Sequence, residues 1–517
     1  MKQPSVVVTS RHSPWFAIVA LLLVLAALSL TQDGPSTERG TRPGPAGHVG
    51  PVARSCQGVT VAPADDLQAV MDAQPPGTTY CLSAGTYRLE APLVPERGDA
   101  IIGDLGAVLN GSKVLTGWRR HGKVWSTTGF LPTAPGTHGE CLASRPSCAH
   151  AEDVFLDKRR MRRVESRSAV AVGTVHADYR TNTITLGEDP RKHLVEQAFA
   201  PSLVRATADD VTIANLVLEQ AANAAQTGAV ESRQVTPLRA GSGWRIHDNE
   251  VRLNHGVGIG LGGGATVTGN LIHRQGQLGF GAWGAGSVVS DNEIAFNGGA
   301  GYSSEWEAGG GKSWMTERMT LTRNHVHGNM GPGLWTDGGN IHTIYEHNKI
   351  TDNWGAGIQH EISYDATIRH NEISGNGRRH KGWAWEAGIQ IQSSGGNQLI
   401  EVAHNVVTAN ANGIVLIDSG DRAEETPAPH GPHVVQNVWV HDNTVTMHPG
   451  ETTGAVEDTG DPAIFSRNNN RFDANTYYLE SLTVPHFSWA GADLDWGDWR
   501  ALGNGNDLNG RAELVSR

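Results

Sequence analysis

Short apolar runs alternate with polar turns in a regular rhythm through the middle of the chain. An Asn recurs with an apolar residue two places later, at Asn249, Asn270, Asn292, Asn324, Asn348, Asn371, Asn405 and Asn443. The spacings are 21, 22, 32, 24, 23, 34 and 38 residues, so the base period is 21–24. Strand-like runs at such a period predict a solenoid. Leucine-rich repeats share the period, but their Leu-x-x-Leu-x-Leu ladder is missing, and the all-β parallel β-helix with three short strands per turn fits better.

Glycines follow the asparagines in step, at Gly258, Gly279, Gly301, Gly333, Gly357, Gly388 and Gly413. Asn and Gly tolerate the left-handed backbone of sharp corners. We therefore interpret both residue types as corner markers. This accounts for much of the high glycine content, 64 residues of 517.

The chain divides into six segments. An apolar run from Trp15 to Leu30 follows Lys2 and Arg11 and, being shorter than the ~20 residues of a spanning helix, predicts an export signal peptide or an uncleaved signal anchor over 1–30. Residues 31–55 are predicted to be a linker, 56–114 an N-terminal cap and first coil with a short helix near 65–73, and 115–205 an inserted antiparallel β module. The β-helix repeats are expected over 206–450 and a C-terminal cap or tail over 451–517.

The four cysteines form two sequence-local pairs, Cys56 with Cys81 and Cys141 with Cys148. Both pairs are compatible with disulfides in an exported protein, and free buried thiols are the alternative. No zinc-like Cys or His arrangement occurs, so neither a structural zinc nor a cofactor is expected.

Several segments carry a family resemblance: 333–340 (GLWTDGGN), 357–364 (GIQHEISY), 306–312 (WEAGGGK) and the tail motifs at 473–477 and 496–499. Over about residues 56 to 505 the chain resembles the right-handed parallel β-helix proteins, the superfamily of pectate lyases and many glycoside hydrolases, in a secreted bacterial subgroup. The resemblance implies the fold and permits several activities on glycans.

Counting from each glycine exposes a column of acids. Strand side chains alternate between faces, so positions +1 and +3 point into the solenoid and +2 and +4 point outward. Position +4 holds Glu305, Asp337 and Glu361, whereas His360 falls at the inward position +3. Strands lie ~4.8 Å apart, so acids one coil apart approach the ~5–5.5 Å of a retaining glycosidase. A solvated acidic ladder or a calcium site is the alternative.

Two insertions interrupt the rhythm beside this column. The first contains Glu307, Lys312 and Trp314; the second, after Asn371, contains a basic run at 378–381 and Trp383, Trp385 and Glu386. Long loops on a rigid solenoid usually carry function. Seven of the 15 tryptophans lie between 283 and 385, which favours a cleft for sugar rings.

The favoured hypothesis is a secreted glycoside hydrolase. Asp337 would be the nucleophile or base and Glu361 the general acid, assisted by Glu305 or Glu307. The substrate-binding residues are predicted to be Lys312, Trp314, Trp335, Gln359, His360, Trp385, Gln390 and Gln392.

Two alternatives stay open: a polysaccharide lyase or uronate epimerase using Lys312 or His360, and a non-catalytic cell-wall-binding solenoid. The net charge of -12 disfavours nucleic acid as a partner. We expect an extracellular or cell-surface monomer that acts on a polysaccharide and touches the membrane only through an uncleaved N-terminal segment.

Overall fold

The computed structural model describes residues 42–234, 239–377, 382–420, 422, 428–502 and 506–515. The expected export segment over 1–30, the first part of the linker and the basic run at 378–381 lie outside these residues. Within the described ranges, none of the helices has the length and apolar character that crossing a bilayer requires.

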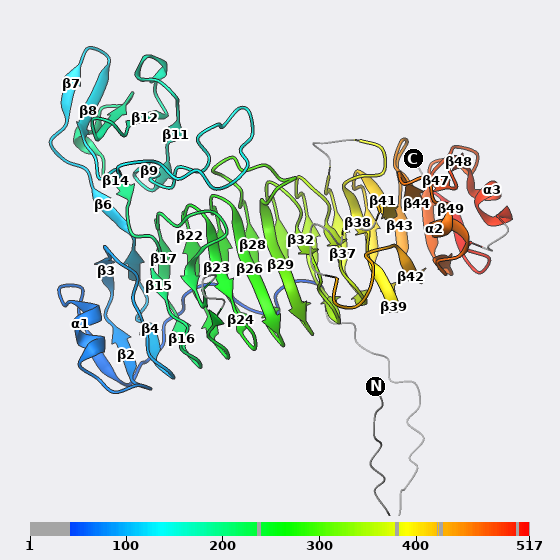
Figure 1. Ribbon diagram of the computed structural model, residues 1–517, viewed down its shortest axis with the longest axis horizontal. Coiled ribbons are helices and arrows are strands. Elements are labelled where there is room, and N and C mark those ends of the chain that lie inside the picture. Colours follow the sequence, from blue (N-terminus) through cyan, green and yellow to red (C-terminus); the bar gives the residue numbers. More distant parts are fainter. Residues whose placement is uncertain are drawn as a thin grey trace, which may run out of the picture. The chain divides into compact units, whose positions relative to one another are not determined.

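Three long sheets, one strand from each per coil, form a parallel β-helix (Figure 1). Sheet A consists of β1 (Val59–Val61), β2 (Thr79–Leu82), β4 (Ala100–Gly103), β16 (Thr212–Ala214), β21 (Arg245–His247), β24 (Thr266–Thr268), β27 (Val288–Ser290), β30 (Thr320–Thr322), β33 (Thr343–Glu346), β36 (Ala366–Arg369), β39 (Gly395–Ala403), β42 (Gln436–His441) and β45 (Arg471–Asp473). Sheet B consists of β3 (Gly85–Arg88), β5 (Ala107–Asn110), β17 (Val217–Glu219), β22 (Glu250–Arg252), β25 (Leu271–His273), β28 (Glu293–Ala295), β31 (His325–His327), β34 (Lys349–Thr351), β37 (Glu372–Ser374), β40 (Val406–Thr408), β43 (Thr444–Thr446), β46 (Thr476–Leu479) and β49 (Arg511–Leu514).

Sheet C consists of β15 (Val204–Arg205), β18 (Gly228–Glu231), β23 (Val257–Leu261), β26 (Leu278–Ala285), β29 (Gly309–Glu317), β32 (Leu334–Asp337), β35 (Ile358–Glu361), β38 (Ala387–Gln392), β41 (Asn412–Asp418), β44 (Thr453–Glu457), β47 (Phe487–Trp489) and β48 (Ala492–Leu494). The α-helices of the described residues, α1 (Leu67–Asp72), α2 (Ala463–Ser466) and α3 (Trp496–Ala501), lie near the two ends of the stack. The predicted parallel solenoid and its short N-terminal helix are confirmed.

Aliphatic side chains fill the interior of the coils. In sheet C the inward positions include Ile259, Leu334, Ile358, Ile389 and Ile414, all fully buried. Each buried aliphatic side chain stabilises the fold by about 1.5–3 kcal/mol relative to exposure. The alternation inferred from the sequence therefore places the correct residues inside.

The recurring asparagines form a buried ladder between sheets A and B. The side-chain amide of Asn348 donates to the Leu321 carbonyl at 2.8 Å and to Asn371 Oδ1 at 3.0 Å. Its own Oδ1 accepts from the backbone N–H of Asn324 at 3.0 Å. The side chains thus satisfy corner backbone groups that no strand pairs, in coil after coil.

A second ladder, between sheets B and C, lies five residues further along each coil. Its members are Asn254, Gln275, Asn297, Asn329, Asn353, Asn376 and Asn410. This second ladder was not predicted, because the repeat was recognised only from the asparagines of the first ladder.

The prediction that the repeat Asn and Gly residues adopt the left-handed corner conformation is wrong at most positions. The left-handed conformation falls on the residue before the Asn, as at His347 (φ 54°) and His370 (φ 55°). Most of the repeat glycines lie at or near the start of sheet C strands without positive φ. A Cβ at Gly357 would lie 2.6 Å from both the Gly388 carbonyl oxygen and Ile373 Cγ2. Glycine is required there because of space rather than because of a turn.

An inserted module separates two neighbouring coils, as predicted. Strand β4 pairs in parallel with β16, and β5 with β17, although the module lies between them in sequence. The module contains two small sheets and two short 3-10 helices: β6 (Ser112–Val114), β9 (Val154–Leu156), β10 (Arg159–Arg160) and β14 (Val195–Ala198), then β7 (Arg119–His121), β8 (Val124–Thr128), β11 (Arg162–Arg163), β12 (Thr174–Asp178) and β13 (Thr183–Leu186), with Arg167–Ala169 and Pro190–Lys192 as the helices. A further hairpin joins β19 (Arg233–Gln234) to β20 (Arg239–Ala240).

The described half of the expected linker, 42–55, packs along the coils. The Gly44 N–H donates to the His347 carbonyl at 2.9 Å and the Gly50 N–H to the Gly269 carbonyl at 2.8 Å. The Val52 N–H donates to Asn215 Oδ1 at 2.7 Å, and Arg54 pairs with Asp248. This segment is a strap rather than a free linker, because polar groups at the A–B corner bind its backbone.

The coils also continue beyond 450, where the rhythm was expected to fade. Asn475 and Asp507 extend the first ladder, and β46 and β49 extend sheet B. Both predicted disulfides, Cys56–Cys81 and Cys141–Cys148, are formed, so the alternative of free thiols is wrong.

Replacing one ladder residue should weaken the whole stack. We expect Asn348→Ala to lower the free energy of unfolding by about 1–3 kcal/mol, since buried backbone groups lose their partners. Denaturant unfolding followed by circular dichroism measures the change. Asn397→Ala, at an exposed position, should leave stability unchanged. Equal unfolding curves for both variants would contradict the ladder's role.

Candidate active site

Two of the three predicted column acids lie side by side on sheet C. Asp337 ends β32 and is the register partner of Glu361, which ends β35. Glu361 is in turn the partner of Gln392 on β38. The predicted pairing of Asp337 with Glu361 therefore holds in the structure.

Glu305 does not belong to this column. On β29, Gly311 pairs with Leu334 and Ser313 with Thr336, so the residue in line with Asp337 is Trp314. The glycine equivalent to Gly333 is Gly310, whereas Gly301 lies in the loop before the strand with φ 100°. The predicted column position of Glu305, counted from Gly301, is wrong because the first insertion precedes the strand instead of following Glu305.

The loop 298–308 nevertheless brings Glu305 and Glu307 over the outer face of sheet C. Exposed Glu305 lies on the rim. Glu307 is buried, accepts a hydrogen bond from Gln226 and lies 3.9 Å from Lys312 Nζ. Glu307 thus joins the predicted group, and Glu305 only borders it.

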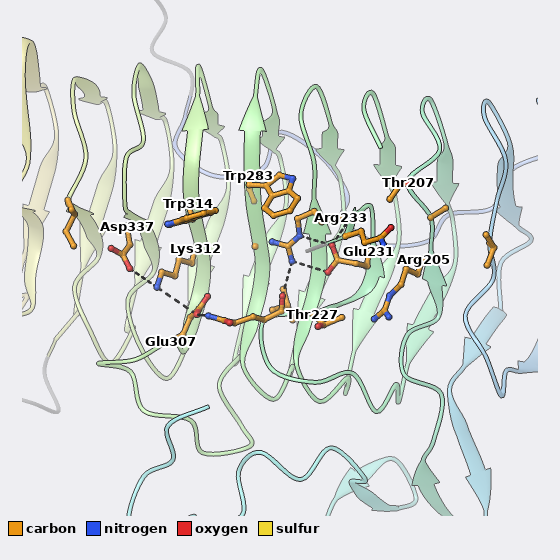
Figure 2. Close-up of a pocket in the computed structure, with 18 of the residues that line it drawn as sticks. Arg205, Thr207, Thr227, Glu231, Arg233, Trp283, Glu307, Lys312, Trp314 and Asp337 are labelled. Carbon is orange, nitrogen blue, oxygen red and sulfur yellow. Dashed lines mark hydrogen bonds and ion pairs between the residues drawn. The ribbon is translucent and has the colours of Figure 1, made fainter. Parts of the chain in front are cut away.

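Lys312 is the cation at the centre of the site. Its Nζ lies 2.8 Å from Asp337 Oδ2 and 4.0 Å from the centroid of the Trp335 ring (Figure 2 shows the contacts with Asp337 and Glu307). Burial by itself would lower the pKa of Lys312, but the carboxylates of Glu307 and Asp337 outweigh it and raise the pKa. Lys312 is therefore a protonated partner of the acids.

Glu361 is a buried carboxyl group with three side-chain donors. Trp335 Nε1 donates to its Oε2 at 2.9 Å and Gln359 Nε2 at 2.8 Å, and Arg422 pairs with Oε1. Burial, followed by the negative charge of Asp337, raises the pKa of Glu361, while Arg422 acts in the opposite direction. Two neighbouring carboxyl groups thus have different surroundings, as acid–base chemistry requires.

These groups lie where two hollows meet. The N-terminal hollow, of about 930 Å³, extends over β18–β29, and the C-terminal hollow, of about 750 Å³, extends over β32–β38. Both are lined by Gln226, Glu307, Lys312, Asp337 and Arg422. Together they form one long cleft along the coils.

Most predicted substrate-binding residues line this cleft. Trp314 faces the N-terminal hollow and Lys312 both hollows. Trp335, Gln359, Trp385, Gln390 and Gln392 line the C-terminal hollow.

His360 is the exception. It lies inside the solenoid, bonded to Thr336 Oγ1 and the Tyr364 carbonyl, both at 2.7 Å, and burial lowers its pKa to about 4. Its assignment as a substrate-binding residue is wrong, because its strand position points inward.

The structure adds residues to the cleft that the site prediction lacked. Glu386 lines the C-terminal hollow, where burial, followed by the charge of Glu305, raises its pKa to about 8. Glu386 could have been predicted from the sequence, because it lies in the second insertion directly after Trp385. Arg422 and the Glu231–Arg233 pair had no distinguishing sequence pattern.

The inserted module supports the acidic loop. Within the Cys141–Cys148 disulfide loop, the Leu142 N–H donates to the Gly301 carbonyl at 3.0 Å. The Ser303 N–H donates to the Glu140 carbonyl at 2.9 Å, and Glu140 lines the C-terminal hollow. The module therefore contributes one wall of the cleft.

No group of three or more His, Cys, Asp or Glu side chains among the described residues could hold a metal ion.

Comparison with known proteins agrees with this architecture. The family model "Right handed beta helix region" matches residues 238–401 and 342–437. No curated protein sequence matches the chain.

Among solved structures, the chain is similar to one titled as the complex of XylC with xylose, at 16% identity and a TM-score of 0.61, covering 80% of each chain. It is also similar to a structure titled glycoside hydrolase, at 10% identity and a TM-score of 0.44, covering 76% of this chain and 91% of that one. The A-module of a mannuronan C-5 epimerase from Azotobacter vinelandii matches at 16% identity and a TM-score of 0.44, over 86% of this chain and 98% of that one. The chain therefore has the right-handed parallel β-helix fold.

Proposed function

We propose that the protein is a secreted carbohydrate-active enzyme, a glycoside hydrolase that retains anomeric configuration. Asp337 is the nucleophile and Glu361 the general acid and base. The observation that carries the proposal is their direct pairing on neighbouring strands, at the junction of two hollows.

The spacing of the strands supports the retaining mechanism. Partners on neighbouring strands are ~4.8 Å apart, close to the ~5–5.5 Å carboxyl separation of retaining enzymes. An inverting enzyme needs about 6.5–9.5 Å to accommodate a water molecule between its carboxyl groups.

The charges around the pair assign the two roles. Lys312 Nζ lies 2.8 Å from Asp337 Oδ2, and a cation at that distance is a suitable partner for a carboxylate nucleophile. The raised pKa of Glu361 favours the protonated form of that group, which suits a general acid.

The reaction then has two steps. Glu361 donates its proton to the glycosidic oxygen while Asp337 attacks the anomeric carbon, so the glycosidic bond breaks and a glycosyl ester forms. In the second step Glu361 takes a proton from water, the resulting hydroxide attacks the anomeric carbon, and Asp337 leaves as a carboxylate. Glu307 forms an ion pair with Lys312 beside the catalytic pair. Trp335 orients Glu361 by donating a hydrogen bond from its indole N–H.

The lyase and epimerase alternative is weaker. It needs a base, but the raised pKa of Lys312 makes that group a poor one, and His360 is enclosed in the solenoid. The C-terminal hollow also carries Glu140 and Glu305, whose negative charges repel an anionic sugar. A non-catalytic glycan-binding solenoid has no need of two adjacent carboxyl groups whose surroundings differ.

The proposed location is extracellular or at the cell surface. Two disulfides fit an oxidising compartment, and the N-terminal signal or anchor stays a prediction. Because the neighbouring structure with a TM-score of 0.61 is titled as a complex with xylose, xylose-containing glycans are the first substrates to test.

Removing either carboxylate should abolish turnover. We expect Asp337→Asn and Glu361→Gln each to lower kcat/KM by about 10²–10⁴-fold or more, measured by release of reducing sugar from a glycan panel. Glu317→Gln, an exposed acid on β29, should retain wild-type activity. NMR of the first product should show the anomer of the substrate. Full activity in both carboxylate variants would end the proposal, and an inverted anomer would exclude the retaining mechanism.

Arg422 should set the alkaline limit of activity. A general acid works only while protonated, so kcat/KM falls as pH rises through the pKa of Glu361. Arg422 lowers that pKa, and Arg422→Met should therefore move the alkaline limb to higher pH. A pH profile of kcat/KM tests this shift, with Glu317→Gln again as control. An alkaline limb that stays at the same pH or moves to lower pH would contradict the assignment of Glu361 as the general acid.

A further inference from the structure

Beyond the catalytic pair, the N-terminal hollow continues in line with the reacting groups. Trp314 is next to Ser313, the partner of Thr336, and so lies one coil before Asp337. Trp283 follows Ala282, the partner of Ser313, and lies one coil further back. With ~4.8 Å between strands, the two indoles lie roughly 5 and 10 Å from the catalytic column.

Both tryptophans face the hollow. Trp314 is 41% exposed, unusually open for a large aromatic side chain, and Trp283 is partly buried. Figure 2 shows them beside Lys312 and Arg233 on the same outer face. Indole faces at this spacing suit successive sugar rings.

The floor of the hollow beside Trp283 contains two glycines. At the outward position that holds Lys312, Trp335 and Gln359 in later coils, β23 and β26 have Gly260 and Gly281. A Cβ at Gly260 would lie 2.4 Å from the Glu231 carboxylate, and one at Gly281 would lie 3.3 Å from Arg233 Nη1. The missing side chains leave room for the hollow, and the Glu231–Arg233 pair lies across its floor.

The charges in this hollow are matched. Arg233 Nε pairs with Glu231 at 2.7 Å, Lys312 pairs with Asp337, and Arg422 pairs with Glu361. Three of the four cations that line the hollow are therefore already compensated by carboxylates. Paired groups of this kind offer hydrogen bonds to hydroxyls but little net attraction for an anion.

We infer that the substrate is a neutral glycan chain lying along the solenoid axis, with at least two sugar units in the N-terminal hollow, on Trp314 and Trp283, next to the bond that is cut. The inference rests on the proposed function for the position of the cut, but binding of the chain does not depend on turnover. Cleavage accordingly takes place within an oligosaccharide rather than at a lone terminal sugar.

The test uses the full-length protein and β-linked xylose oligomers from the disaccharide to the hexasaccharide. Binding is measured by calorimetry on Asp337→Asn, and kcat/KM on the wild type. Affinity should rise at least about tenfold with length, or about 1.4 kcal/mol. If xylose oligomers do not bind, the same length series of neutral glucose and mannose oligomers takes their place, and absence of a length effect in all three overturns the inference.

Variants locate the effect. Trp314→Ala and Trp283→Ala should each lower the ratio of hexasaccharide to disaccharide kcat/KM by about tenfold. Gly281→Val should lower the same ratio by filling the hollow, since its Cβ meets only the flexible ends of Arg233 and Val257. Trp439→Ala, in sheet A, should leave the ratio unchanged. If none of the three hollow variants changes the ratio, the glycan chain binds elsewhere. Circular dichroism checks that each variant is folded.

Two outcomes separate this inference from the proposed function. Oligogalacturonates of equal length should bind no more tightly than the neutral disaccharide, and tighter binding would overturn the neutral substrate. If Asp337→Asn still cleaves glycans, the catalytic assignment fails while length-dependent binding can stand. If Asp337→Asn is inactive and binding shows no length dependence, the extended chain fails while the catalytic pair stands.

Discussion

The hydrogen bonds between successive coils are the constraint on which the rest of the molecule depends. Parallel strands pair in register in three sheets, and two ladders of buried amides bind the corner backbone between them. Because each coil stacks directly on the last, residues one period apart become neighbours at the spacing of adjacent strands. The pairing of Asp337 with Glu361 is a direct consequence of this register.

The loops convert one face of the stack into a site. Outward side chains of sheet C would be open to solvent on a bare solenoid, yet Glu361 and Gln392 are only 6% exposed. Residues of the loop 298–308, together with Trp385 and Glu386 before β38, line the same hollow, and the disulfide-closed loop of the inserted module supports the loop 298–308. A rigid scaffold thus supplies position, while the insertions exclude water and change the electrostatics of the carboxyl groups.

Electrostatics then differentiates two acids that the scaffold places side by side. Asp337 has Lys312 as its close cation, whereas Glu361 is deeply buried beside the charge of Asp337. A glycan that carried its own negative charge would meet further carboxylates at Glu140 and Glu305. The same arrangement that distinguishes an acid from a nucleophile therefore favours a neutral sugar chain.

The sequence by itself determined the fold and the central pair, because a period of 21–24 residues with alternating faces fixes which residues stack. It also predicted both disulfides, and every predicted site residue except His360 lines the cleft. The count failed at Glu305, since an insertion displaced the strand and no local pattern marks where a coil resumes. Only the tertiary structure decided that Arg422 contacts Glu361 and that residues 42–55 form a strap. It also decided that Trp314 occupies the column position that was predicted for Glu305. Those contacts join residues that are distant in sequence and obey no period, so their positions depend on how loops pack on the finished stack.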